Sequence, residues 1–367
     1  MFGKKDTNAP DTAELSAQLS EVMEPELEET LGALGFLGPV AVDGKLVEVT
    51  LHLPTPAWSK KAELEARVRA RIDGRIGDRK VSIRHEPKVE RSRGTSATDL
   101  LPDVKNILLF ASGKGGVGKS TVATNVAAGL ARAGAKVGLL DADIYGPSIP
   151  TMLGSDERPE INGQKLSPIK KYGMELMSIG FIVKPEDAMV WRGPMLNSAL
   201  TQLMRDVEWG PLEYLIIDMP PGTGDVQLTI AQNLKVSGAV LVSTPQKVAL
   251  ADVVRGKAMF DKTGIPVVGL VENMAYFVCG SCSARHDIFS TGGAGQLATE
   301  LQLPLFGEIP IDIEARQAAD AGRPVVLEHP DSASAAAFMG VAEAAATMLA
   351  KAARTVTARP SGLKIIQ

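Results

Sequence analysis

The feature that most constrains the fold is a glycine-rich segment, SGKGGVGKST, between an apolar run, NILLFA, and a helix-forming stretch, TVATNVAAGLARAG. A strand, the pattern G-x-x-x-x-G-K-[ST] and a helix, in that order, are typical of a phosphate-binding loop. Its glycines let backbone N–H groups surround phosphate oxygens, and the helix N-terminus adds positive potential. We therefore expect an ATP site, with a glycine-rich turn that binds no nucleotide as the alternative. The predicted contact residues are Gly113, Lys114, Gly115, Gly116, Val117, Gly118, Lys119, Ser120 and Thr121.

Beyond Lys105 the chain alternates between short apolar runs and helical stretches. Near-continuous apolar runs of this kind are typical of parallel strands that are buried on both faces. We therefore predict an α/β fold, a doubly wound P-loop NTPase domain with a mainly parallel sheet, over residues 105–355, followed by a tail at 356–367. The expected strands lie in NILLFA, KVGLLDAD, ELMSIGF, YLIIDMP, GAVLVST, PVVGLVEN and PLFGEIP.

A different pattern precedes this domain. Residues 1–12 are polar and are predicted to be disordered. Residues 13–90 predict a small α+β domain, because the alternating runs on both sides of Asp43-Gly44 in VAVDGKLVEVTLHL indicate a β-hairpin and a charged helical stretch follows it. The polar segment 91–104 predicts a linker.

Composition narrows the partners. The net charge of −4 and the pI near 5.7 provide no basic field for nucleic acid or anionic lipid. The N-terminus has no apolar signal core, and no apolar run approaches the ~20 residues of a membrane helix. We therefore expect a cytoplasmic protein with no nucleic-acid or membrane partner and with reduced cysteines.

Polar side chains end three of the predicted strands, at the edge where parallel sheets bind ligands. Asp218 ends an apolar strand and suits a carboxylate that holds Mg²⁺ through water, beside the hydroxyl of Ser120. Asp141 and Asp143 end LLDAD, and Asn273 ends LVEN. An amide can donate and accept at an adenine edge at once. Capping of the next helix is the alternative for each aspartate, and an ordinary turn residue is the alternative for Asn273.

The chain has only two cysteines, Cys279 and Cys282, and they share the motif CGSC. This spacing suits two thiolates on one metal centre, whereas a zinc ion or a [4Fe–4S] cluster usually takes four ligands. A symmetric dimer would supply all four, so we interpret CGSC as half of a shared site. A redox pair, a bridging zinc ion, a third ligand from His286 and cysteines without a role are the alternatives.

Several stretches together resemble the Mrp-type (ApbC-like) iron–sulfur cluster carrier ATPases, over about residues 105–350. They are GKGGVGKSTVATNVA, LLDADIYGPSIPTMLG, MVWRGPML, LIIDMPPGTGDVQLT, and VENMAYFVCGSC followed by FSTGGA. The extra lysine, Lys114, resembles the signature lysine of deviant Walker A ATPases, which reaches the partner's nucleotide across a homodimer. The resemblance implies catalytic roles for Lys114, for Lys119 and for Asp143, which would orient the attacking water. It also implies an adenine contact for Asn273.

The same resemblance implies an activity. It predicts a Mg²⁺-dependent ATPase whose homodimer holds a labile [4Fe–4S] cluster between the two CxxC motifs and delivers it to apo-proteins, with a cluster scaffold as a further partner. The N-terminal domain resembles one shared with iron–sulfur assembly factors, but Trp58 stands where many relatives carry a cysteine. Direct cluster ligation by this domain is therefore not expected, and a docking role is.

Two other classes of protein contain a glycine-rich phosphate loop of this kind and are alternatives. A positioning or partitioning ATPase would need a basic amphipathic C-terminus or a basic surface, and this chain ends in ARPSGLKIIQ and is acidic overall. In a positioning or partitioning ATPase, the two cysteines would also have no function. A P-loop reductase bridges its cluster with cysteines from two separated regions of each chain, whereas both cysteines here come from one motif.

Overall fold

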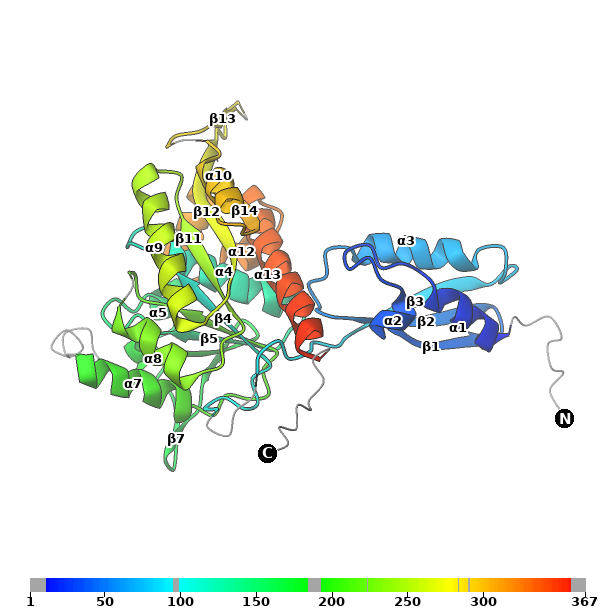
Figure 1. The fold of residues 1–367 in the computed structure, drawn as a ribbon, viewed down its shortest axis with the longest axis horizontal. Helices are drawn as coiled ribbons and strands as arrows, with labels where there is room; N and C mark the ends of the chain where they lie inside the picture. The colour runs from blue at the N-terminus through cyan, green and yellow to red at the C-terminus, as the bar shows by residue number, and fades with distance from the viewer. Residues whose placement is uncertain are drawn as a thin grey trace, which may run out of the picture. The chain divides into compact units, whose positions relative to one another are not determined.

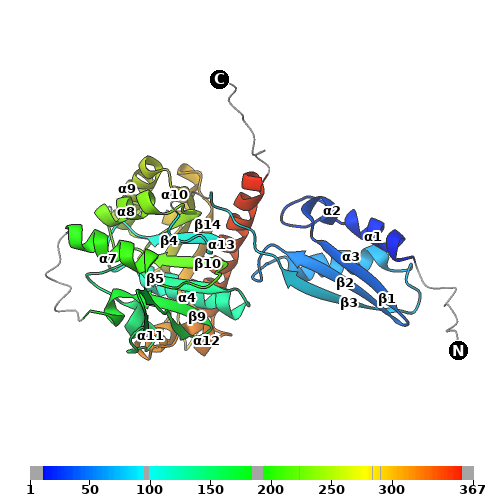
Figure 2. The same cartoon turned by 90° about the horizontal axis from the view of Figure 1, so that it is seen from below.

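The computed structural model describes residues 11–94, 99–183, 193–222, 224–282, 284–289 and 291–357 (Figures 1 and 2). The chain forms two compact units that divide between Val89 and Glu90. The predictions for residues 1–10 and 358–367 lie outside the described residues, so only the edges of the expected disordered segment and tail can be compared. At the C-terminal edge the last helix runs to Thr357, two residues beyond the predicted end of the domain.

The first unit is a small α+β domain. Its elements are α1 (Thr12–Ser20), α2 (Leu31–Leu34), β1 (Leu37–Asp43), β2 (Leu46–Leu53), α3 (Lys61–Ile72) and β3 (Lys80–Pro87). The strands β1 and β2 pair antiparallel across the expected Asp43-Gly44 turn, and β3 pairs parallel to β2. Apolar residues of β2 alternate with polar ones and are buried, which gives the three-stranded sheet one face in the core.

Trp58 is a packing residue of this unit. Its ring is 3% exposed and meets Phe36 edge to face, with ring centroids 6.5 Å apart. Its indole N–H donates to the fully buried carboxylate of Glu24 over 3.0 Å, and that carboxylate also accepts from the backbone N–H groups of Glu26 and Leu27. At this position the chain therefore buries an indole whose N–H satisfies a carboxylate.

The described part of the predicted linker, 91–104, is bonded to the second unit. The guanidinium of Arg93 is buried, pairs with Asp99 at 2.6 Å and donates to the backbone carbonyls of Leu101 and Val104. Leu101 and Val104 pack in the apolar core of the second unit. The polar residues that predicted a linker thus form a buried ion pair and backbone hydrogen bonds.

The second unit is built on a nine-stranded sheet with the order β8-β9-β5-β10-β4-β11-β12-β14, and β13 extends the far end of β12. Its strands are parallel except β8 and β13, which pair antiparallel with β9 and β12. Every residue of β4, β5, β10 and β11 is buried, as the continuous apolar runs predict. The strands are β4 (Asn106–Ala111), β5 (Val137–Asp141), β8 (Ile169–Lys171), β9 (Met174–Ser178), β10 (Tyr214–Asp218), β11 (Gly238–Ser243), β12 (Val267–Val278), β13 (Arg285–His286) and β14 (Leu305–Ile311).

Helices cover both faces of this sheet (Figure 2), which confirms the doubly wound α/β fold. The helices α4 and α13 pack together on one face, and α9 and α10 lie on the other. Outside the sheet, the strands β6 (Ile161–Asn162) and β7 (Lys165–Leu166) pair antiparallel and form a two-stranded hairpin. The helices are α4 (Lys119–Arg132), α5 (Ile149–Met152), α7 (Gly193–Arg205), α8 (Asp225–Asn233), α9 (Lys247–Thr263), α10 (Gly293–Glu300), α11 (Ile313–Asp320), α12 (Val325–Glu328) and α13 (Ala333–Thr357).

The helix α13 is, within the described ranges, the one segment long and apolar enough for a membrane span, over Ala333–Thr355. Half of its apolar window is buried inside the unit, where the helix packs on α4 and β14. Burial of this kind accounts for its apolar composition as that of a core helix.

Candidate nucleotide site and cysteine hairpin

The predicted phosphate loop joins β4 to α4 at the edge of the sheet where the parallel strands end. Gly116 and Gly118 have φ angles of 81° and 78°, a left-handed backbone that favours glycine. At Gly113 the reason is close packing, because a Cβ there would lie 2.2 Å from the Cβ of Asp252 in α9. The glycines of the motif therefore serve both backbone conformation and close packing.

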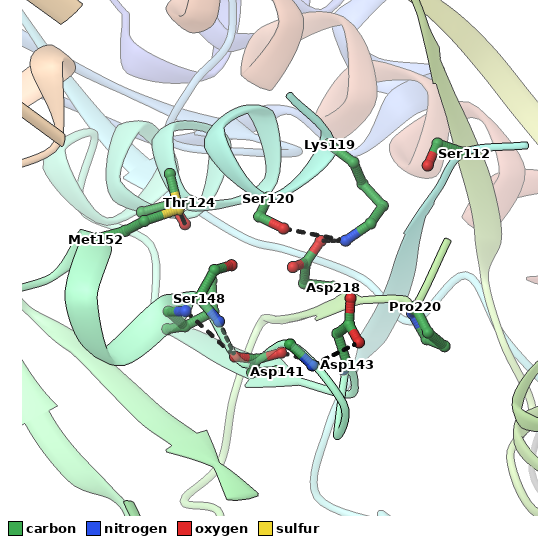
Figure 3. A network of polar contacts seen from close by, with 12 residues as sticks. Ser112, Lys119, Ser120, Thr124, Asp141, Asp143, Ser148, Met152, Asp218 and Pro220 are labelled. Carbon is green, nitrogen blue, oxygen red and sulfur yellow. Dashed lines mark hydrogen bonds and ion pairs between the residues drawn. The ribbon is translucent and has the colours of Figure 1, made fainter. Parts of the chain in front are cut away.

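Lys119 and Asp218 form a buried ion pair at the start of α4 (Figure 3). The Lys119 Nζ lies 2.5 Å from Oδ1 of Asp218 and 3.1 Å from the hydroxyl of Ser120. Burial raises the pKa of Asp218, and the Lys119 ammonium opposes this rise. The structure thus brings the predicted phosphate-binding lysine to the predicted Mg²⁺ carboxylate.

A Mg²⁺ ion fits the donors present. The second carboxylate oxygen of Asp218, Oδ2, is buried and has no hydrogen-bond partner among the described residues. The hydroxyl of Ser120, which accepts from the Lys119 ammonium, lies next to the same carboxylate (Figure 3). Mg²⁺ prefers one or two protein oxygens together with water and phosphate oxygens, which is the set that a nucleotide in this loop would complete.

Asp141 holds the loop that carries Asp143. One oxygen of its fully buried carboxylate accepts from the backbone N–H of Asp143 at 3.1 Å, and the other accepts from the N–H groups of Ser148 and Ile149 and from the hydroxyl of Ser178. Burial, and next the charge of Asp218, raise the pKa of Asp141 to about 7. Asp141 therefore supports the loop that carries Asp143 and accepts from N–H groups at the start of α5, which is the capping role given above as the alternative.

Asp143 itself is half-buried and lies near Asp218 and Pro220 (Figure 3). Its Oδ1 accepts from the backbone N–H of Gly146 at 3.2 Å, which fixes the side chain within its loop. The carboxylate therefore stands at the strand ends with Lys119 and Ser120, as the sequence predicts.

A cavity of about 630 Å³ adjoins the loop. Its wall contains Gly118 and Thr121 from the start of α4, Asn273 and Met274 from β12, and the segment from Ile309 into α11. The side-chain nitrogen of Asn273 donates to the backbone carbonyl of Val117 at 2.9 Å, so the amide is fixed against the loop. The cavity is mainly apolar, which suits the flat face of a base next to a phosphate site.

Lys114 is half-buried on the loop, and the hydroxyl of Ser112 donates to its backbone carbonyl at 2.9 Å. This bond positions the backbone of Lys114. Its role across a dimer stays a prediction.

The two cysteines lie at the tip of a hairpin that β12 forms with β13, at the end of the unit beyond α10 (Figure 1). Phe277 pairs with His286 and Val278 with Arg285, and the N–H of Cys279 donates to the carbonyl of Ala284. Cys282 is exposed and Cys279 half-exposed.

The hairpin favours a thiolate. Backbone N–H groups of Ser281 and then Cys282 point at the sulfur of Cys279 and lower the pKa of this thiol. Among the described residues, no group of three or more His, Cys, Asp or Glu side chains could hold a metal ion within one chain. The exposed tip of the hairpin therefore offers the side chains of Cys279 and Cys282 as two neighbouring sulfur ligands from one chain.

Three features escaped sequence reasoning. The short strand β13 has no apolar pattern, so the hairpin could not be predicted. Arg285 stacks on the ring of Tyr276 with 3.9 Å between guanidinium carbon and ring centroid, and pairs with Asp287 and Glu308. Met274 has a left-handed backbone with a φ angle of 57°. A methionine in an apolar run gives no sign of such a backbone conformation.

A mainly parallel sheet with a phosphate loop after one strand, and an aspartate at the end of its neighbour, defines a P-loop NTPase. Residues 103–346 match the ParA-type family described as the NUBPL iron-transfer P-loop NTPase, and residues 12–83 match the iron–sulfur cluster assembly protein family. The chain therefore belongs to the family of iron–sulfur cluster carrier P-loop NTPases.

Individual relatives agree with this assignment. An iron–sulfur cluster carrier protein of Deinococcus radiodurans is 45% identical over 350 residues, which are 95% of this chain and 98% of that protein. A nucleotide-binding protein from Archaeoglobus fulgidus, solved in complex with ADP, is 38% identical with a TM-score of 0.56 over 63% of this chain and 93% of its own. The cell division ATPase MinD of Pyrococcus furiosus, 24% identical with a TM-score of 0.52 over 66% of this chain and 99% of its own, shares the fold.

Proposed function

We propose that this protein binds and hydrolyses ATP, holds a labile [4Fe–4S] cluster between the CxxC motifs of a homodimer, and transfers that cluster to apo-proteins. The observation that carries the proposal is the exposed β12–β13 hairpin, which bears both cysteines of the chain and is joined directly to the wall of the nucleotide cavity. Family membership supports the same cargo.

ATP would replace internal contacts of the site. The β- and γ-phosphates would take the Lys119 ammonium, which now pairs with Asp218, while Asp218 and Ser120 would hold a Mg²⁺ ion. Mg²⁺ neutralises charge on the phosphates. Asp143 would orient the attacking water, because its side chain is fixed at the same strand ends. Asn273, held against the loop, would contact the adenine.

Lys114 would act across the dimer on the nucleotide of the partner, which requires the loops of two copies to face each other. Such a dimer also brings four thiolates together, two from each hairpin. Their exposure suits a cluster that must leave, because solvent-accessible ligands can exchange with the thiols of a recipient.

The partners follow from the cargo. Apo-proteins that need a cluster would be the recipients, and a cluster scaffold would be the donor. The first unit would dock one of them rather than ligate the cluster, because no cysteine lies in it. We infer a cytoplasmic location without nucleic-acid or membrane partners, in line with the acidic balance.

A transfer assay tests the proposal. Wild type, reconstituted anaerobically with iron and sulfide, is expected to activate an apo-aconitase-type [4Fe–4S] enzyme. The Cys279→Ala/Cys282→Ala variant should not activate it and should keep wild-type ATPase activity. Ile288→Ala, at an exposed residue just beyond the same hairpin, is the matched control and should activate the enzyme as wild type does. Equal activation by the double variant would refute the proposed carrier role.

A further inference from the structure

The strand β12 contains an irregularity between the nucleotide cavity and the cysteines. In its pairing with β14, Asn273 lies opposite Ile309 and Phe277 lies opposite Ile311. Between these two pairs β12 advances by four residues and β14 by only two, which is a β-bulge in β12. At this bulge Met274 takes its left-handed backbone, with φ at 57°. A bulky L-residue pays a steric cost in that conformation and keeps it only where its surroundings hold it.

The nucleotide side of the bulge touches the phosphate loop. The side-chain amide of Asn273 donates to the carbonyl of Val117. Its nitrogen is so close to the loop that a Cβ added to Gly118 would lie 2.1 Å from it. Met274 lines the cavity, and its terminal methyl lies 3.7 Å from the same position. A base in this cavity would therefore meet the residue that carries the strain.

The other side of the bulge is the root of the hairpin. Phe277 pairs with His286 on one side and with Ile311 on the other, and Cys279 follows two residues later. The segment Pro310–Ile313 lines both the nucleotide cavity and a groove of about 570 Å³ beside Phe277, Val278 and Gly280. The nucleotide cavity and the hairpin thus share one strand and one wall.

We propose that the left-handed backbone at Met274 is a two-state joint through which a nucleotide in the cavity sets the position of the cysteine hairpin. Met274 is a positioning residue in this account. A base that contacts its side chain shifts the balance between the bulged backbone and an extended one, and the hairpin follows because Phe277 moves along Ile311. The proposal rests on the proposed function only in taking the hairpin as the cargo site.

The expected size of the shift between the bulged and the extended backbone follows from the steric cost of a left-handed conformation at Met274. A left-handed L-residue is disfavoured by a factor of about 5 to 30 relative to its ordinary conformations. Glycine has no such bias, and it also lacks the side chain that would meet the base. In Met274→Gly the hairpin should therefore lose its response to nucleotide, whereas Met274→Leu keeps both the Cβ, and hence the backbone bias, and an apolar side chain that can meet the base.

Hydrogen–deuterium exchange on the full chain, free of iron and sulfide, tests this. Peptides that span the hairpin are compared without nucleotide, with saturating Mg·ADP and with a saturating non-hydrolysable ATP analogue. Wild type should change its exchange rate between these conditions by about 5- to 30-fold, and Met274→Leu should keep at least half of that change on a logarithmic scale. Met274→Gly should show less than a twofold change. Gln302→Gly is the matched control, since Gln302 is also left-handed, with φ at 55°, but is exposed and outside both cavities.

Several outcomes would overturn the proposal. They are a wild-type hairpin that does not respond to nucleotide, a Met274→Gly variant that responds as wild type does, a Met274→Leu variant as unresponsive as glycine, and a control that loses the response too. Because no iron or sulfide is present in this experiment, failure of the cluster proposal would leave its result unchanged.

Discussion

Replacement of Lys119 by methionine would leave the carboxylate of Asp218 alone in the interior. The two side chains are 6% and 0% exposed and lie 2.5 Å apart, so the lysine is the main partner of this charge. Removal of one member of such a buried pair typically costs 3–5 kcal/mol, because the remaining charge is uncompensated. We expect Lys119→Met to lose about 3–5 kcal/mol of stability at pH 8 without nucleotide.

The pH dependence has a definite sign. Burial raises the pKa of Asp218, and loss of the ammonium raises it further. A carboxyl group with a raised pKa in the folded state stabilises the protein below its unfolded pKa and loses this contribution as the pH rises through the folded pKa. The cost of Lys119→Met should therefore be larger at pH 8 than at pH 5.5.

A double variant separates charge from packing. Lys119→Met/Asp218→Leu removes both charges and should recover most of the loss, since apolar replacement of a buried pair is often neutral or stabilising. Urea unfolding followed by circular dichroism measures all three proteins. A single variant that costs less than about 1 kcal/mol at pH 8, or a double variant no more stable than the single one, would refute the reasoning.

Three further predictions concern other residues. The pKa of Asp141, about 7 in the folded protein, means that wild type should lose about 2–3 kcal/mol relative to Asp141→Asn between pH 5 and pH 8, measured by urea unfolding at each pH. Gly118→Ala places a Cβ 2.1 Å from the Asn273 amide at a left-handed φ, so it should weaken ATP binding at least tenfold in a calorimetric titration. Trp58→Phe removes the indole N–H from the buried carboxylate of Glu24, and the first unit should lose about 1–3 kcal/mol in thermal unfolding.

The sequence predicted most of the second unit because its strands are continuous apolar runs. Burial on both faces of a parallel sheet leaves that pattern in β4, β5, β10 and β11, and the glycine-rich loop marks the end of β4. The same logic placed Asp143, Asp218 and Asn273 at one edge. Their assembly there follows from the direction of the strands alone.

The features that the sequence did not predict depend on contacts between distant segments. Arg93 lies in a polar stretch, and only the folded chain shows the carbonyl groups and the Asp99 carboxylate that bury it. Met274 is an ordinary strand residue by type, and its left-handed backbone arises from the bulge against β14. The pairing of Lys119 with Asp218 joins residues far apart in the chain and depends on β4 and β10 being neighbours.

Iron and sulfide content measured together with solution mass, after anaerobic reconstitution, tests the central claim most directly. The account predicts four irons and four sulfides per two chains, on a dimer, and none on Cys279→Ala/Cys282→Ala. A cluster on a single chain, or equal iron content in the double variant, would contradict a site shared between two hairpins.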